Sequence, residues 1–477
     1  MIGANLEAGG DGAALDGTPY GKQMAVAATG NYKNAYRLGK VSCSEGAALG
    51  VNWAFAPVVD IDKNFRNPIT NIRTYGNNAD KIIEYATNYI KAAKEENVAT
   101  AIKHFPGDGV NERDQHILTS INRLSRKEWD DSYGRIYSKL IEEGTLSVMV
   151  GHIALPSYQL YYNPQDNGKV IPATLSPELL GDLLRKKLKF NGLIITDATP
   201  MVGFTSALER RIAIPYAIES GCDMILFNKD LEEDYTFMMD GYKKGILSEN
   251  RFQEAITRIL AMKAALKLHI KQKERKLVPD KAALKILKSE EHIKWARELS
   301  DQSITLVKDT QHILPISSQK TKRVLLEVIG NCKSENRIIK KFQHELQLRD
   351  FDVTIYKKED FSKKVDNITM IREKYDLVLY VGNIENESNK TTNRINWYTF
   401  FGQGNNIPWF VKEVPTLFIS LSNPYHLFDV PMIKTYINCY SNNDFVIESV
   451  VGKICGDSTF KGVSPIDPFC GKDELRY

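Results

Sequence analysis

The sequence is short of several features that mark whole classes of proteins. Its 477 residues include six cysteines, none in a Cys-x-x-Cys spacing, which are too few and too scattered for a disulfide scaffold or a zinc cage. No apolar run approaches the roughly 20 residues that a membrane-spanning helix needs, so we expect no membrane span. The N-terminus lacks a basic stretch followed by an apolar one, the pattern of a secretory signal. These absences predict a cytoplasmic protein.

A large charge of one sign is also missing. The chain has 63 basic and 59 acidic residues, and the net charge of +4 gives no reason to expect a nucleic-acid partner. Hydrophobic residues make up 43% and charged residues 26%, which is an ordinary globular composition. At this length the chain can form two or three domains with ample cores.

Short apolar runs alternate with amphipathic stretches over the first 270 residues. Several runs are apolar at consecutive positions, as at 148–150 and 193–195, which is typical of strands buried on both faces. The expected strands are 53–58, 98–103, 146–152, 193–196 and 224–227, and the expected helices are 79–96, 127–143, 177–188, 206–220 and 250–268. A further strand before Asn5 makes six. The alternation predicts an α/β fold with a parallel sheet, best fitted by a (β/α)8 barrel, with an open doubly wound sheet as the alternative.

A basic, polar run near residue 270 interrupts this pattern and is followed by a second α/β segment. We interpret the run as a solvated helix end and linker, with an anionic docking patch as the alternative. The predicted domains are therefore residues 1–270, a linker at 271–295, and an α/β sandwich at 296–477. The strands expected in the second domain are 304–308, 324–329, 353–356, 377–381, 417–421 and 436–439, and its expected helices are 335–349 and 445–455.

Polar residues follow the apolar strands at the point where each strand ends. Active sites of parallel α/β barrels lie at the carboxyl ends of the strands. His104, His152 and Asp197 stand at such positions and are therefore candidates for the active site. Asp197 fits a base, a metal ligand or a covalent nucleophile, or else the N-cap of the next helix.

A Pro-Gly-Asp-Gly turn follows Lys103 and His104, and a loop with Asp114 and His116 comes next. A carboxylate that accepts from one imidazole nitrogen fixes the tautomer and prepares the other nitrogen for general acid/base work. Asp114 and His116 are two residues apart and fit such a pair. The alternative is a polar loop that carries Asp and His incidentally.

At this point the sequence resembles a known family, on the strength of seven segments that occur in order. These segments are Asn-Leu-Glu-Ala-Gly-Gly (5–10), Phe-Ala-Pro-Val-Val-Asp-Ile (55–61), Asn-Ile-Arg-Thr-Tyr-Gly (71–76), Lys-His-Phe-Pro-Gly-Asp-Gly (103–109), Asp-Gln-His (114–116), Gly-Leu-Ile-Ile-Thr-Asp-Ala-Thr-Pro-Met (192–201) and Gly-Cys-Asp-Met-Ile-Leu (221–226). They are similar to the landmarks of glycoside hydrolase family 3, in its β-N-acetylglucosaminidase branch. The resemblance extends over residues 1 to about 270, and the later segment resembles the sandwich domain that many members append.

The resemblance implies a retaining exo-β-N-acetylglucosaminidase (β-hexosaminidase) that needs no metal and no cofactor. The substrate it implies is a small carbohydrate that contains N-acetylglucosamine. It assigns Asp197 as the nucleophile, His116 as the acid/base and Asp114 as the residue that tunes it. It also assigns a set of residues that bind the sugar hydroxyls: Arg73, Lys103, His104 and Asn5. Asn5 stands where the family usually has Asp, so it keeps the hydrogen bonds and loses the charge.

Two other functions stay open on the same residues. One is a β-N-acetylglucosaminide phosphorylase, in which phosphate replaces water. The other is an inactive, truncated carbohydrate-binding relative, because family members carry further residues, including the first barrel strand, before the segment of Asn5. We therefore expect a gap in the barrel wall beside the Asn5 strand, and a signal peptide that precedes this segment is compatible with the family.

Three further residues have a structural and a functional interpretation. His152 and Met201 fit either the sugar site or the core, and we expect Cys222 in the core.

Overall fold

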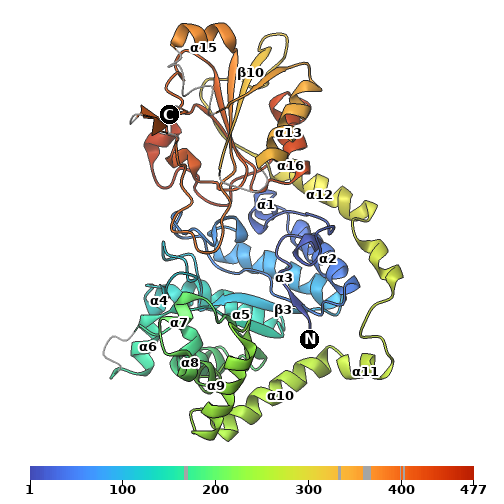
Figure 1. Cartoon of the computed structure of the whole chain (residues 1–477), viewed down its shortest axis with the longest axis vertical. Helices are drawn as coiled ribbons and strands as arrows, with labels where there is room; N and C mark the ends of the chain where they lie inside the picture. Colours follow the sequence, from blue (N-terminus) through green and yellow to red (C-terminus); the bar gives the residue numbers. More distant parts are fainter. Residues whose placement is uncertain (166–169, 331–334, 358–366, 398, 401–402, 405) are drawn as a thin grey trace. The chain divides into compact units, whose positions relative to one another are not determined.

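The computed structural model describes residues 1–165, 170–330, 335–357, 367–397, 399–400, 403–404 and 406–477, which form two compact units (Figure 1). The first unit comprises Met1–Gln23, Tyr32–Ile293 and Glu387–Thr391. The second unit comprises Met24–Asn31, Lys294–Asn386 and Thr392–Tyr477. The short stretch 387–391 thus packs with the first unit although its neighbours in sequence belong to the second.

The first unit is built on a curled sheet of six parallel strands. In spatial order they are β1 (Gly3–Ala4), β2 (Trp53–Ala54), β3 (Ala99–Phe105), β5 (Ser147–Val150), β7 (Leu193–Ala198) and β8 (Met224–Leu226). Neighbouring strands are in register, with Ile102 opposite Val148 and Val148 opposite Ile194. Strands β4 (Ser120–Ile121) and β6 (Ile153–Ala154) pair in parallel and form a separate two-stranded sheet. Because all six strands are parallel, their carboxyl ends meet at one edge, where the site lies.

Helices follow the strands in alternation. The α-helices are α2 (Lys33–Ala48), α3 (Ala79–Glu95), α4 (Arg126–Trp129), α5 (Arg135–Glu142), α6 (Pro156–Tyr162), α7 (Val202–Thr205), α8 (Arg210–Glu219), α9 (Leu231–Lys243), α10 (Glu249–Ala265) and α11 (Leu268–Lys273). Two π-helical segments are η3 (Asp130–Gly134) and η5 (Glu178–Lys187). The 3-10 helices are η1 (Gly10–Gly12), η2 (Asn71–Arg73), η4 (Ala173–Leu175) and η6 (Lys281–Ile286). Helices α2, α3 and α5 pack in sequence against one another, and α8 packs on α9 (Figure 1). No helix in the described part of the chain is both long and apolar enough to cross a membrane.

Helix α3 shows how the sequence sets these elements. It begins at Asn78, whose side chain accepts from the backbone N–H of Lys81 and so satisfies one of the free donors of the first turn. Its buried residues include Ile82, Tyr85 and Tyr89, which recur at the spacing of one helix face. That stripe packs the helix against its neighbours.

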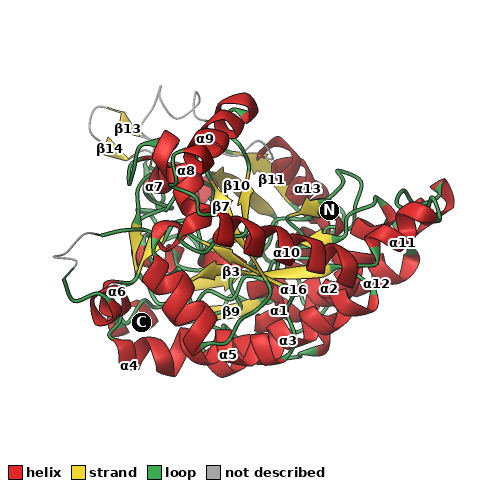
Figure 2. Cartoon of the chain, turned by 90° about the horizontal axis from the view of Figure 1, so that it is seen from below, coloured by secondary structure: helices red, strands yellow, loops and turns green. Residues whose placement is uncertain are grey.

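Alternate side chains of the central strands share one apolar cluster with α10. The cluster includes Ala99 and Ala101 of β3, Ile195 of β7, and Met262 of α10 with Leu266 just after it. Figure 2 shows α10 lying across the strands. Helix α10 therefore covers one face of the sheet.

The curled, open sheet of six parallel strands confirms the predicted fold class, a (β/α)8-type barrel that is incomplete. Each strand expected at 53–58, 98–103, 146–152, 193–196 and 224–227 is present, with shorter or shifted bounds. Within the described residues the sheet is open, because β1 pairs only with β2 and β8 only with β7. The gap expected beside the strand of Asn5 is thus found, and a closed eight-stranded barrel is not formed by these residues.

One expected helix has other bounds, and helices α2, α6 and α9 were not expected. The helix expected over 206–220 begins at Arg210 and is preceded by the separate short helix α7. Helix α2 was not predicted, because Gly39, Gly46 and three serine or asparagine residues lower its intrinsic helix propensity. Packing against α3 stabilises it instead, and Gly39 permits that approach: a Cβ there would lie 2.7 Å from the carbonyl oxygen of Tyr89.

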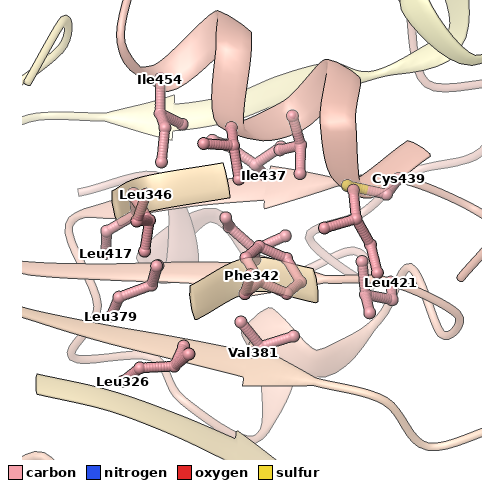
Figure 3. Packing of buried hydrophobic residues seen from close by; sticks show 14 of the residues in the cluster. Leu326, Phe342, Leu346, Leu379, Val381, Leu417, Leu421, Ile437, Cys439 and Ile454 are labelled. Carbon is pink, nitrogen blue, oxygen red and sulfur yellow. The ribbon is translucent and has the colours of Figure 1, made fainter. Parts of the chain in front are cut away.

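The second unit is a three-layer α/β sandwich, as predicted. Its sheet has the order β11 (Asp352–Ile355), β10 (Arg323–Ile329), β12 (Leu377–Gly382), β15 (Thr416–Ser420), β16 (Thr435–Asn438) and β9 (Thr305–Asp309), with only β9 antiparallel. One face packs on α13 (Glu335–Gln347) and α16 (Asp444–Ile454), where Phe342 and Leu346 meet Leu379 and Leu417 (Figure 3). The other face carries a second apolar cluster that includes Ile371 of α15 (Ile368–Lys374).

Candidate active site

Three polar residues lie around the carboxylate of Glu7 at the carboxyl end of the sheet. Arg73, at the end of η2, donates to Glu7 through Nε to Oε2 at 2.9 Å and through Nη2 to Oε1 at 2.8 Å. Lys103 of β3 places Nζ 2.6 Å from Glu7 Oε1 and 3.2 Å from Asn5 Oδ1. The structure thus brings together the predicted residues Asn5, Arg73 and Lys103.

Glu7 is a site residue that the sequence interpretation missed. It lies two positions after Asn5, within the quoted segment 5–10. Its side chain is only 13% exposed, so its charge needs compensation from Arg73 and Lys103. Asn5 carries no charge, and Glu7 supplies the carboxylate that holds both cations in place.

The buried charges shift one another's ionisation. Burial alone would raise the pKa of the Glu7 carboxyl, but the charges and hydrogen bonds of Arg73 and Lys103 outweigh it, and the pKa lies well below its usual value. Burial lowers the pKa of the Lys103 ammonium, while the Glu7 charge opposes that effect. Burial alone would also lower the pKa of Arg73, but Glu7 raises it above the usual value. Glu7 is therefore ionised at neutral pH.

We expect Glu7→Gln to lower the free energy of unfolding by about 3 kcal/mol at pH 7, because it leaves two buried cations without their carboxylate. The folded-state pKa of Glu7 is depressed, so its contribution is complete above about pH 4.5 and is lost as the pH falls below that value. Urea unfolding of both proteins at pH 7 and at about pH 4 measures this, and the difference should shrink at the lower pH. Asp131→Asn, which removes an exposed ion pair with Lys127, is the control and should have little effect. Equal stability of Glu7→Gln and the unchanged protein at pH 7 would contradict the expectation.

Asp197 lies near the end of β7, beside His104. Its Oδ1 accepts from the backbone N–H of Ala198 at 2.8 Å, and its Oδ2 is 3.9 Å from His104 Nε2. Met201, and not Asp197, occupies the N-cap position of the helix that follows, so the N-cap interpretation of Asp197 is wrong. A carboxylate with one short backbone hydrogen bond and a second oxygen facing an imidazole is free to react through that oxygen.

The surroundings keep Asp197 ionised. Burial alone would raise the pKa of its carboxyl, but His104, the Ala198 N–H and Lys103 together bring the pKa below its usual value. An ionised carboxylate is the form that a nucleophile or a base requires.

A second carboxylate missed by the sequence interpretation, Asp60, orients His104. Asp60 Oδ2 is 2.7 Å from His104 Nδ1, and Oδ1 accepts from the backbone N–H groups of His104 and Asp108 at 3.1 and 2.8 Å. Asp60 is fully buried. The pair fixes the His104 ring so that Nε2 faces Asp197. Asp60 was within the quoted segment 55–61, but only the fold reveals its partner.

Asp108 lies in the turn that follows. Burial, together with the charge of Asp60, raises the pKa of Asp108 to about 7. Its Oδ1 accepts from Asn67 Nδ2 at 3.1 Å and from the Gly109 N–H at 2.7 Å, which ties the side chain into the turn. These contacts assign Asp108 to the support of the turn.

Asp114 and His116 form the predicted pair. Asp114 Oδ1 accepts from His116 Nδ1 at 2.6 Å and from the His116 backbone N–H at 2.9 Å. The Asp114 side chain is fully buried and the His116 side chain is 24% exposed. Gln115 between them anchors the loop, because its Oε1 accepts from the His152 N–H at 2.7 Å. The predicted contact between Asp114 and His116 is therefore present, and the catalytic role of the pair stays a prediction.

The loop of His116 also contacts the segment that follows Asp197. The carbonyl oxygen of His116 accepts from the Val202 N–H at 3.0 Å. Across the described residues, no hydrogen bond or ion pair joins the side chains of His116 and Asp197. The two groups thus belong to neighbouring segments of one site and remain separate from each other.

His152 has a structural role. It is fully buried, with Nδ1 3.0 Å from Thr174 Oγ1 and Nε2 3.0 Å from the carbonyl oxygen of Ala198. Burial lowers its pKa, so the neutral ring donates through Nε2 and fixes the backbone next to Asp197. Met201 and Cys222 are also buried.

The family of the chain follows from comparison with known proteins. The model of the family described as "Glycosyl hydrolase family 3 N terminal domain" matches residues 1–262. The chain belongs to this family. The predicted family and the enzyme class, a glycoside hydrolase, are thereby confirmed.

Individual relatives agree with this membership. A "Beta-N-acetylglucosaminidase/beta-glucosidase" of Cellulomonas fimi is 42% identical over 483 residues, which cover 99% of this chain and 84% of that protein. "Beta-hexosaminidase A" of Pseudoalteromonas piscicida is 28% identical over 314 residues, 63% of this chain and half of that protein. Among solved structures, "Beta-glucoside phosphorylase BglX" has a TM-score of 0.94 and 43% identity to this chain. The match covers all of this chain and 86% of the phosphorylase chain. The structure of a β-N-acetylglucosaminidase from Paenibacillus sp. str. FPU-7 supports the fold, with a TM-score of 0.81 and 23% identity. This match covers 98% of this chain and 86% of the Paenibacillus chain.

Proposed function

We propose that this family 3 glycoside hydrolase is a retaining exo-β-N-acetylglucosaminidase that releases terminal β-linked N-acetylglucosamine. The observation that carries the proposal is an ionised carboxylate, Asp197, in the same site as a separate imidazole–carboxylate pair, His116 and Asp114. The Cellulomonas fimi relative, named for both N-acetylglucosaminides and glucosides, supports the substrate class and makes β-linked glucose the second sugar to test.

In the first step Asp197 attacks the anomeric carbon and forms a glycosyl ester, while the bond to the leaving oxygen breaks. His116 donates its Nε2 proton to that oxygen, and Asp114 holds the Nδ1 proton and stabilises the imidazolium before transfer. Arg73, Lys103, His104 and Asn5 bind the sugar hydroxyls and hold the ring over Asp197. In the second step the neutral His116 accepts a proton from water, which attacks the ester and regenerates Asp197. Two inversions give overall retention.

Phosphorolysis on the same ester is a second candidate. A neutral imidazole does not repel an anionic acceptor, whereas the carboxylate base of most retaining glycosidases would. The similarity to a β-glucoside phosphorylase at 43% identity favours the same candidate.

Product analysis tests both. The chain is incubated with p-nitrophenyl β-N-acetylglucosaminide and, separately, with the β-glucoside, with and without inorganic phosphate. Hydrolysis predicts free N-acetylglucosamine of retained configuration, at a rate that phosphate does not change. A sugar 1-phosphate, with a rate that rises with phosphate, would establish the phosphorylase instead. Absence of nitrophenolate release from either sugar would contradict both.

A further inference from the structure

A short segment distant in sequence contacts the His116–Asp114 pair. This segment, Glu387–Thr391, packs with the first unit, and we call it the dyad strap. Two of its residues, Ser388 and Asn389, make hydrogen bonds to His116 and Asp114 across more than 270 positions of sequence. The proposed mechanism uses neither residue.

The backbone of the strap completes the hydrogen bonding of Asp114. The N–H of Asn389 donates to Asp114 Oδ2 at 2.7 Å, while Oδ1 takes the two N–H groups of His116. Both carboxylate oxygens are therefore engaged, and Asp114 cannot rotate without losing one of these bonds. Asn389 has φ of 67°, in the left-handed region that asparagine tolerates better than most residues. That conformation is the one in which the strap presents its N–H to the carboxylate.

The side chain of Ser388 engages the opposite edge of the imidazole. Its Oγ is 3.0 Å from His116 Nε2. Because Asp114 accepts from Nδ1, Nε2 is the nitrogen left to exchange a proton with the leaving oxygen. A hydroxyl both donates and accepts, so Ser388 satisfies Nε2 whether or not that nitrogen carries a proton.

We propose that the dyad strap positions the acid/base: Asn389 holds Asp114 through its backbone, and Ser388 holds His116 Nε2 until the glycosidic oxygen takes its place. Ser388 is thus a positioning residue that acts through His116 in the free enzyme. The proposal rests on the proposed function, in which His116 is the proton donor. It adds that the ring is aligned before the substrate arrives, which lowers the cost of reaching the reactive geometry.

The test compares two substrates of different leaving groups in Ser388→Ala. Chitobiose has a sugar alcohol as its leaving group and needs full protonation, whereas 2,4-dinitrophenolate leaves without it. We expect kcat/KM for chitobiose to fall roughly three- to tenfold, because an imidazole that is not aligned beforehand must be ordered when the substrate binds. We expect kcat/KM for the dinitrophenyl glycoside to stay within about twofold. Ser388→Thr, which keeps the hydroxyl, should restore chitobiose cleavage. Thr391→Ala, which removes a hydroxyl from the same strap, is the matched control and should change neither.

A double-mutant cycle separates failure of this inference from failure of the proposed function. In a His116→Ala background Ser388→Ala should have no further effect on either substrate, because its route through the imidazole is gone. If His116→Ala itself shows no dependence on the leaving group, the proposed function fails. If His116→Ala shows that dependence and Ser388→Ala gives no loss, an equal loss for both substrates, or a gain, the dyad strap does not position the acid/base.

The backbone contact has its own pair of variants. Asn389→Gly keeps the N–H and favours positive φ, so chitobiose cleavage should stay within about twofold. Asn389→Val also keeps the N–H but disfavours this φ, so it should reproduce the selective loss of Ser388→Ala. Equal behaviour of the two variants would overturn the assignment of Asn389.

Discussion

Asp197→Asn is expected to lower kcat/KM for a nitrophenyl β-N-acetylglucosaminide by several orders of magnitude, on the order of 10⁴-fold. A neutral amide cannot form the glycosyl ester, whereas the carboxylate of Asp197 is held in its ionised form by the surrounding donors. The fold should survive, because the amide oxygen can still accept from the Ala198 N–H as Oδ1 does. Steady-state kinetics, together with a thermal melt of both proteins, measures the two effects.

The matched control is Asp230→Asn. Asp230 caps α9, where its side chain accepts from the Glu233 N–H at 2.8 Å, and asparagine caps a helix about as well as aspartate. It should keep both activity and melting temperature. Substantial activity in Asp197→Asn would exclude Asp197 as the nucleophile. If that variant unfolds, Asp197→Glu tests the role instead, and it should also lose most activity because its carboxylate is displaced by the longer side chain.

His116→Ala should show a loss that depends strongly on the leaving group. Cleavage of chitobiose should fall by about 10²- to 10⁴-fold, the usual contribution of a general acid. Cleavage of a 2,4-dinitrophenyl glycoside should lose much less in its first step, because dinitrophenolate departs without a proton. Asp114→Asn should show a milder form of the same pattern, since Asp114 orients the imidazole at 2.6 Å without moving the proton itself.

Kinetics over a series of leaving groups of graded basicity checks this expectation. Equal losses for all leaving groups would assign His116 to binding or structure. Asp108 would then be the next candidate for the proton donor, because its pKa of about 7 keeps part of it protonated near neutral pH. Asp108→Asn, measured over the same series, would decide that alternative.

The parts of the site that could be predicted from the sequence are those that local patterns encode. The consecutive apolar residues of β5 and β7 indicate buried parallel strands. The polar residues Lys103, His104 and Asp197 lie at the carboxyl ends of β3 and β7. Asp114 and His116 are two positions apart, so their contact is also local.

What could not be predicted depends on contacts between distant segments. Glu7 meets Arg73 across 66 positions and Asp60 meets His104 across 44. Both carboxylates lie in segments that carry the family resemblance, but no local pattern shows which residues they contact. Ser388 and Asn389 reach the dyad across 272 and 275 positions, with no motif around them. The bounds of the strands were also misjudged where pairing ends early, as at β2, which covers only Trp53–Ala54 of the expected 53–58.

Mass spectrometry of the trapped ester tests whether Asp197 forms a covalent bond to the sugar. A fluorinated β-glycosyl fluoride slows the second step more than the first, so the glycosyl-enzyme should accumulate. We expect one added sugar per chain and, after proteolysis at low pH, its location on the peptide that contains Asp197. A label on another carboxylate, such as Asp60 or Asp108, or turnover without any trapped ester, would contradict it.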